Sequence, residues 1–252
     1  MIEIFILSLI QGITEFLPIS SSSHLILISN YLEYENQNLS IDLSLHIGSF
    51  FAVSVYFYKE ILNFFENKDL FLKVFISSFP VMIVGFLLLK TGTIDKIRSL
   101  ETIAWTTLIF AILLYISDKF KLEKNIKENY TFKSAIYIGF FQILSLIPGV
   151  SRSGIAITAA RLLHFKRVDS AKISFLLSIP ILGSVSAYGL KDIIFSDDLY
   201  FSKLNLIAIT FSFLFSLVTI KFFLKYINNF SLNIFVLYRV FLGIFLLMLT
   251  YL

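Results

Sequence analysis

The chain has no cysteine and few charged residues. The first absence excludes several kinds of site, and the second excludes an ordinary soluble domain. Without cysteine there is no disulfide, no thiolate nucleophile and no cysteine-ligated zinc site. Only 15% of the 252 residues are charged while 57% are hydrophobic, and the mean hydropathy of +0.85 lies far above the range of soluble domains. The composition is that of a helical membrane protein that crosses the bilayer several times.

The basic residues do not indicate a nucleic-acid partner. The net charge is +4, but no basic stretch is interleaved with aromatic residues, as a nucleic-acid interface would require. The three histidines, His24, His46 and His164, also lack the spacing of a zinc-hydrolase motif. The charge is better explained by basic cytoplasmic loops between membrane helices.

Six segments are long and apolar enough to cross a bilayer. A hydrocarbon core takes ~20 helical residues, and helix is the expected state because backbone polar groups in lipid must bond within their own segment. The predicted spans are residues 41–58, 71–89, 100–117, 171–190, 204–224 and 231–252.

Two further segments, residues 1–30 and 132–165, are long enough to span but are interrupted at their centres. The sequence LPISSSS occupies 17–23 and PGVSRSG occupies 148–154. Proline stops a helix and serine favours the start of the next one, so each segment is expected to return to the side from which it entered. We predict that both are re-entrant helical hairpins.

The two hairpins resemble each other at a fixed offset. Gln11 precedes Ser20 by nine residues and Gln142 precedes Ser151 by nine, which gives an offset of 131. When 131 is added to the residue numbers of the first three spans, the resulting ranges match the last three spans. An odd number of spans inverts the second copy, so the tips of the hairpins are expected to meet near the middle of the membrane.

The predicted fold is therefore an all-α polytopic membrane protein with six transmembrane helices and two re-entrant hairpins in an inverted repeat. It forms a single membrane domain over residues 1–252, with a first repeat at 1–120 and a second at 131–252. Apart from Arg152 and Arg239, five Lys and Arg residues lie in loops on the side of the N-terminus and fourteen on the other side. The positive-inside rule predicts that both termini, and the mouth of the first hairpin, face outward.

The polar residues of the first hairpin suit phosphate chemistry. Gln11 and Glu15 are four residues apart and share one face of a short helix, which Pro18 then ends. Hydroxyls at the next helix start cap free N–H groups, and the same N–H groups attract anions. Glu15 is a candidate metal ligand or base, and His24 a candidate proton carrier or nucleophile.

The second hairpin offers a similar helix start at Ser151 and Ser153, together with Arg152. Its planar guanidinium suits a pair of phosphate oxygens. A proline and serine break in a membrane helix is often only a kink, but two such breaks in register, with an intramembrane Glu and Arg, favour a functional site.

Simpler structural roles fit other residues. His46 suits a structural role and a site role equally, and His164 has no predicted role. Arg239 is expected to pair with carbonyls or a carboxylate rather than with substrate. Trp105 and the tyrosines are predicted to be packing or interface anchors.

The sequences QGITEFLPISSSSHL at 11–25 and PGVSRSG at 148–154 resemble the two signature stretches of bacterial undecaprenyl-diphosphate phosphatases of the BacA/UppP type. The resemblance extends along the whole chain. It implies hydrolysis of undecaprenyl diphosphate to the monophosphate carrier for peptidoglycan synthesis, in the bacterial inner membrane, with a divalent cation, Mg²⁺ or Ca²⁺, and a link to bacitracin resistance. The implied partners are the polyprenyl diphosphate lipid and bilayer lipids.

Carried over by position, the family's motifs assign roles to individual residues of this chain. The predicted catalytic residues are Glu15, Ser21, His24 and Arg152. The predicted substrate-binding residues are Gln11, Ser20, Ser22, Ser151, Arg152 and Ser153. Glu15 is also the predicted metal ligand.

The chain departs from the family pattern at two functional positions. Many members have Glu where this chain has Gln11, so Glu15 is left as the carboxylate of the motif. Ala156 stands where a phosphate-binding Thr is expected, and Thr158 would point to a different face of the helix.

Other functions remain open at this stage. Inverted repeats with broken helices are also typical of transporters, so a polyprenyl-phosphate flippase or anion transporter is the alternative function. A second superfamily of membrane phosphatases is excluded because Thr158 stands where its histidine would fall. The nucleophile is His24, a serine or a metal-bound water, and the oligomeric state is open, a homodimer being compatible with the sequence.

Overall fold

The computed structural model of the chain describes residues 1–32, 39–66, 68–92, 97–194 and 199–251. Within these ranges the regular elements are helices, apart from an isolated β-bridge between Lys124 and Phe165. The all-α prediction is therefore confirmed.

Six helices are long and apolar enough to cross a membrane. They are α3 (Leu39–Tyr56), α5 (Lys68–Thr91), α7 (Leu100–Asp118), α11 (Arg167–Ile194), α12 (Leu199–Asn229) and α13 (Asn233–Tyr251). Each overlaps one of the predicted spans, so the chain is a multi-pass membrane protein.

The two interrupted segments form helical hairpins whose halves pack against each other. The first comprises α1 (Ile2–Thr14) and α2 (Ser21–Leu32), and the second comprises α9 (Phe132–Ile143), η1 (Leu144–Leu146) and α10 (Arg152–Leu162). The breaks fall at the predicted proline and serine clusters, because proline lacks the N–H that would continue the helix.

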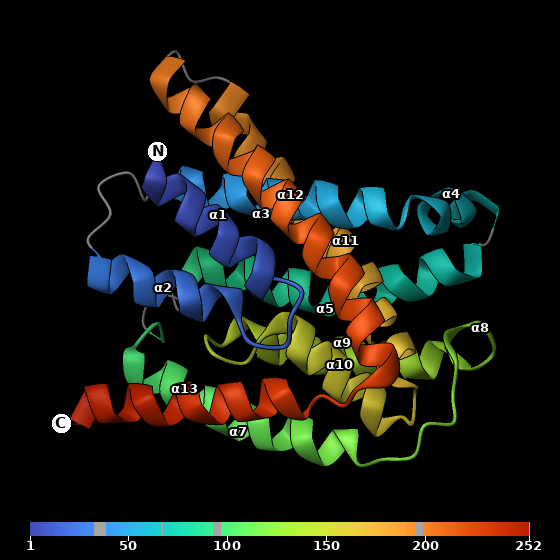
Figure 1. Cartoon of the computed structure of the whole chain (residues 1–252). Coiled ribbons are helices and arrows are strands. Elements are labelled where there is room, and N and C mark those ends of the chain that lie inside the picture. The colour runs from blue at the N-terminus through green and yellow to red at the C-terminus, as the bar shows by residue number, and fades with distance from the viewer. Residues whose placement is uncertain (33–38, 67, 93–96, 195–198, 252) are drawn as a thin grey trace.

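The two ends of the bundle differ in what they carry. Figure 1 shows both chain termini at one end, and the short helices α4 (Tyr58–Glu66) and α8 (Ile126–Asn129) at the other. The termini therefore lie on one side, as an even number of spans requires.

The centre of the bundle is held by close helix contacts through small residues. Helix α3 packs against both α11 and α12. At Gly48 an added Cβ would lie 2.4 Å from the carbonyl oxygen of Ile209, so only glycine fits there. Ser49 contacts Ser212 and Ser216 across the same interface at 3.3 and 3.0 Å.

The outer surface of the bundle is apolar, as lipid contact requires. Large side chains such as Phe86, Trp105 and Phe241 are exposed on the spans, which agrees with the predicted surface role of Trp105.

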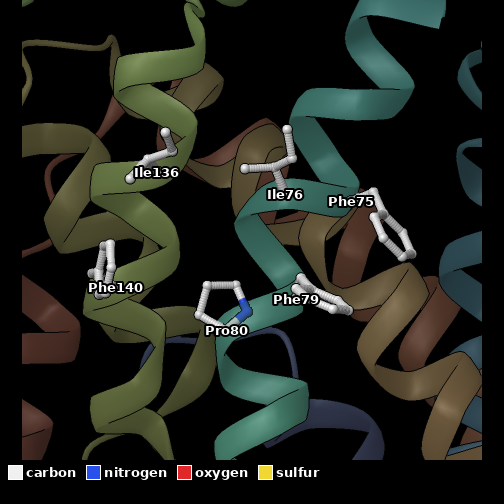
Figure 2. Close-up of a pocket in the computed structure, with 6 residues that line it drawn as sticks. All are labelled: Phe75, Ile76, Phe79, Pro80, Ile136 and Phe140. Atoms are coloured by element: carbon white, nitrogen blue, oxygen red, sulfur yellow. The ribbon is translucent and has the colours of Figure 1, made fainter.

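An apolar groove of about 250 Å³ lies between α5 and α9. Figure 2 shows its lining side chains on the two neighbouring helices, with Ile76 and Ile136 on the sides that face each other. The lining residues are Phe75, Ile76, Phe79, Pro80, Ile136 and Phe140. Helix α9 runs from this groove to the break of the second hairpin.

Candidate active site

The two hairpin breaks share an unusual backbone conformation. Ser20 and Ser151, which are 131 residues apart, both have a φ of 73°. Residues other than glycine rarely adopt this left-handed region, and such strain gathers at functional sites. A helix begins directly after each serine, α2 at Ser21 and α10 at Arg152. The hydroxyl of Ser151 caps its helix by accepting a hydrogen bond from the backbone N–H of Gly154 at 3.1 Å.

The tips of the two hairpins contact each other directly. Arg152 of the second hairpin forms a hydrogen-bonded ion pair with Glu15 of the first. The side chains are 14% and 5% exposed, so the pair is largely removed from solvent. Beside it, the hydroxyl of Ser153 donates to the carbonyl oxygen of Leu17 at 2.7 Å. The sequence-based expectation that the tips meet is confirmed.

Glu15 is the centre of a polar cluster drawn from three parts of the chain. Besides Arg152, its carboxylate accepts hydrogen bonds from Nε2 of Gln11 at 2.9 Å and from Oγ of Ser21 at 2.6 Å. His46 of α3 places Nδ1 2.9 Å from Nε2 of Gln11 and 3.8 Å from Oε2 of Glu15. The structure therefore places His46, which the sequence left undecided, beside the predicted site.

The predicted binding serines lie at the starts of α2 and α10. The hydroxyl of Ser20 is 3.4 Å from that of Ser22, and the hydroxyl of Ser151 is 3.2 Å from that of Ser153. Free N–H groups and the helix dipole favour an anion at each of these starts. The site thus combines two helix N-termini with the guanidinium of Arg152.

His24 is held in one tautomer. Its Nδ1 lies 2.7 Å from the carbonyl oxygen of Ser20, which can only accept, so Nδ1 carries the proton. The other nitrogen, Nε2, lies 2.5 Å from the hydroxyl of Tyr238 on α13. The sequence analysis did not predict this contact of Tyr238, and its position next to Arg239 in the sequence is the signal that could have found it.

Arg239 joins both hairpin breaks to α13. It is 1% exposed, and its guanidinium donates to the carbonyl oxygens of Pro18, Val150 and Gly149 at 3.2, 3.1 and 2.9 Å. The prediction that Arg239 pairs with backbone carbonyls is confirmed. Because Pro18 and Gly149 belong to different hairpins, one side chain fixes their relative position.

The departure at Ala156 leaves α10 without a second hydroxyl for the site. Ala156 is fully buried, and the hydroxyl of Thr158 donates to the carbonyl oxygen of Gly154 at 2.8 Å. Thr158 therefore does not replace the missing threonine.

The residues of the cluster offer few ligands for a divalent cation. No group of three His, Cys, Asp or Glu side chains in the described part of the chain could hold a metal ion. The carboxylate of Glu15 accepts three hydrogen bonds, but Oε1 of Gln11 is a buried oxygen without a partner. Two protein oxygens, from Glu15 and Gln11, fit a cation that takes its remaining ligands from phosphate and water, as Mg²⁺ commonly does.

Comparison of the sequence with known proteins identifies the family. The sequence model of the family described as "Bacitracin resistance protein BacA" matches residues 4–245. The chain belongs to the BacA family. The match includes both hairpin breaks and at least part of each of the six spans.

Three relatives carry the name undecaprenyl-diphosphatase. An undecaprenyl-diphosphatase from Pelagibacter ubique (strain HTCC1062) is 51% identical over 99% of this chain and 98% of its own length. Undecaprenyl-diphosphatases from Jannaschia sp. (strain CCS1) and from Alteromonas mediterranea are 36% and 39% identical, over 98% and 97% of this chain and the same shares of their own. This chain is therefore similar to BacA-family proteins over their full length.

Replacing Arg239 with methionine should destabilise the protein and abolish turnover. Methionine preserves much of the apolar volume but leaves the carbonyls of both breaks without a donor in a dry interior, at a cost of about 3 kcal/mol or more. Thermal unfolding in detergent measures the loss. The exposed Arg98→Met is the control and should match the wild type; equal melting temperatures for Arg239→Met and Arg98→Met would contradict the bridging role.

Proposed function

We propose that this chain is an integral-membrane phosphatase that hydrolyses undecaprenyl diphosphate to undecaprenyl phosphate and inorganic phosphate. Full-length relatives are named undecaprenyl-diphosphatase. The observation that carries the proposal is the Glu15–Arg152 pair, which brings two anion-attracting helix starts together inside an apolar bundle. The product is the lipid carrier that peptidoglycan synthesis reuses.

Arg152 and the serines bind the diphosphate in this proposal. The contact with Glu15 uses Nη2 of Arg152, and a guanidinium has five N–H donors, so donors remain for phosphate oxygens. The starts of α2 and α10 add backbone N–H groups, with Ser20, Ser22, Ser151 and Ser153 around them. Glu15 holds Arg152 in position and balances the positive charge of its guanidinium before substrate binds.

His24 supplies the reacting nitrogen. With Nδ1 protonated, the lone pair of Nε2 is available to act. Nε2 either attacks the terminal phosphorus or removes a proton from the water that does so. In both routes the bond from the terminal phosphorus to the bridging oxygen breaks, and undecaprenyl phosphate leaves with that oxygen. When Nε2 attacks, water then hydrolyses the phosphohistidine to inorganic phosphate; when water attacks, inorganic phosphate forms directly. Ser21, whose hydroxyl donates to Glu15, is the alternative nucleophile.

A divalent cation, Mg²⁺ or Ca²⁺, completes the proposed site. Glu15 and Oε1 of Gln11 would hold it together with substrate oxygens. When bound, it would neutralise charge on the phosphate oxygens and polarise the phosphorus. One chain supplies every residue in this account, so the chemistry needs no second copy.

The groove between α5 and α9 suits part of the polyprenyl tail. Its lining is entirely apolar, and α9 leads from it to the second hairpin break (Figure 2). An isoprenoid chain in the groove would remain in contact with lipid while its diphosphate reached the hairpin tips.

The duplicated organisation and the orientation are also part of the proposal. The shared φ of Ser20 and Ser151, and the full burial of Gln11 and Gln142, support two repeats offset by 131 residues. The excess of Lys and Arg at the end opposite the termini supports a cytoplasmic location for that end. The mouth of the first hairpin would then open to the periplasmic side of the bacterial inner membrane.

Transport is the alternative for this architecture. A flippase or anion transporter needs an anion site but no group positioned for proton transfer or attack. The fixed tautomer of His24 and the names of the relatives favour the phosphatase.

Arg152→Lys should lose most of the activity. An ammonium group cannot make the planar two-point contact with phosphate oxygens, so kcat/KM should fall at least a hundredfold. The assay is phosphate release from undecaprenyl diphosphate by purified protein, at equal expression. The exposed Arg98→Lys serves as the control. Near wild-type turnover in Arg152→Lys would remove this residue from the site, and inactivity of the wild type would refute the proposed function.

Gln11→Glu should lower the cation concentration needed for half-maximal activity, because it adds a second anionic ligand beside Glu15. The maximal rate should change less. Glu15→Gln and His24→Ala should stay inactive across the whole Mg²⁺ and Ca²⁺ titration, the first through loss of the carboxylate and the second through loss of the reacting nitrogen. EDTA defines the cation-free baseline.

Gln142→Glu is the matched control for this titration. Gln142 occupies the corresponding position of the second hairpin, where its Nε2 donates to the carbonyl oxygen of Ser77 at 3.3 Å, so the substitution should not shift the cation curve. If Gln11→Glu leaves the curve unmoved while added metal rescues His24→Ala, the roles of Glu15 and His24 are both wrong.

Single cysteines test the orientation, since the chain has none of its own. Lys90→Cys, at the end of α5, should react from outside with an impermeant thiol reagent in intact cells. Lys121→Cys, just after α7, should react only after permeabilisation. The reverse labelling pattern would invert the proposed topology.

A further inference from the structure

The contact between His24 and Tyr238 joins residues that are 214 positions apart in the chain. The hydroxyl of Tyr238 lies 2.5 Å from Nε2 of His24, and the two rings are nearly parallel, with centroids 5.7 Å apart and 13° between their planes. Because Nδ1 of His24 donates to the carbonyl of Ser20, Nε2 is the acceptor and the phenol is the donor. Tyr238 therefore covers the one nitrogen of His24 that is able to react.

Tyr238 is held in place by its neighbour in α13. Arg239 is fully buried and bonded to the carbonyls of both hairpin breaks. The position of Tyr238 is thus fixed relative to the same breaks that carry His24 and Arg152. Its side chain is 41% exposed, so the phenol has room to move while its backbone stays fixed.

The place that the phenol occupies is also the place that the reaction needs. In either proposed route an oxygen of water or a phosphorus atom must approach Nε2 along its lone pair, where the hydroxyl of Tyr238 now lies. A hydrogen bond from the phenol holds the imidazole ring so that the lone pair of Nε2 points to this position before substrate binds.

We infer that Tyr238 is a positioning residue for His24: its hydroxyl orients and covers Nε2 in the free enzyme and yields that place to the reacting group when substrate binds. The inference rests on the proposed function for its effect on turnover. The contact itself is independent of that function, and it can be tested separately.

The kinetic test is Tyr238→Phe. Phenylalanine keeps the ring stacked on His24 and removes only the hydroxyl. Loss of one orienting hydrogen bond should lower kcat about tenfold with little change in KM, because the residue acts through His24 and not on the bound lipid. Tyr251→Phe, on the same helix with its hydroxyl bonded to Glu101, is the matched control and should retain wild-type kcat.

The chemical test uses diethyl pyrocarbonate, which modifies the free nitrogen of a neutral imidazole. In substrate-free protein, His24 should be modified about tenfold faster in Tyr238→Phe than in the wild type or Tyr251→Phe. The chain contains only two other histidines, His46 and His164, and their rates, measured by peptide mass spectrometry, should be unchanged.

The outcomes separate the inference from the proposed function. Equal modification rates of His24 in all variants would overturn the covering role, and a raised KM with unchanged kcat would overturn the positioning role. If the wild type releases no phosphate from undecaprenyl diphosphate, the proposed function fails, while the modification rates still decide whether Tyr238 covers Nε2.

Discussion

The Glu15–Arg152 pair is the constraint on which the proposed site depends, because a carboxylate and a guanidinium in contact offset each other's cost of burial inside an apolar bundle. Each charge alone would cost several kcal/mol to bury. Together they fix the first hairpin against the second. They also place the guanidinium of Arg152 and the carboxylate of Glu15 near the starts of two helices. In the proposed function, the same pair that stabilises the contact also provides the charges for phosphate chemistry.

The remaining structure holds this pair in place. The breaks at Ser20 and Ser151 adopt a strained backbone, directly after which α2 and α10 begin. Arg239 satisfies carbonyls of both breaks from α13, and the contacts of α3 at Gly48 bring its helix, and with it His46, against the rest of the bundle. The proposed function and the fold thus depend on the same few buried polar residues.

Much of this arrangement could be predicted from the sequence. Hydropathy predicted the six spans, and the proline and serine clusters predicted both breaks. A helix in lipid rarely ends without such residues, because its backbone polar groups would lose their hydrogen bonds. The offset of 131 and the intramembrane charges pointed to Glu15 and Arg152 as members of one site, although not to their ion pair. These inferences depend on local chemistry and on the general cost of burying charge.

The contacts that the sequence did not predict are those between side chains far apart in the chain. His46 lies beside Gln11 because α3 packs against α1, and Tyr238 reaches His24 because Arg239 anchors α13 to both breaks. A single sequence gives no register between such helices. Tyrosine is also common at membrane interfaces, so Tyr238 carried no signal except its arginine neighbour.

A double-mutant cycle on the stability of the purified protein tests the central claim most directly. Glu15→Gln and Arg152→Met each leave one buried charge without its partner, and each should lower the free energy of unfolding by about 3–5 kcal/mol. Because the double variant contains neither charge, it should lose clearly less than the two losses added together. Losses that simply add would show that Glu15 and Arg152 do not depend on each other, and would contradict a site built on their pairing.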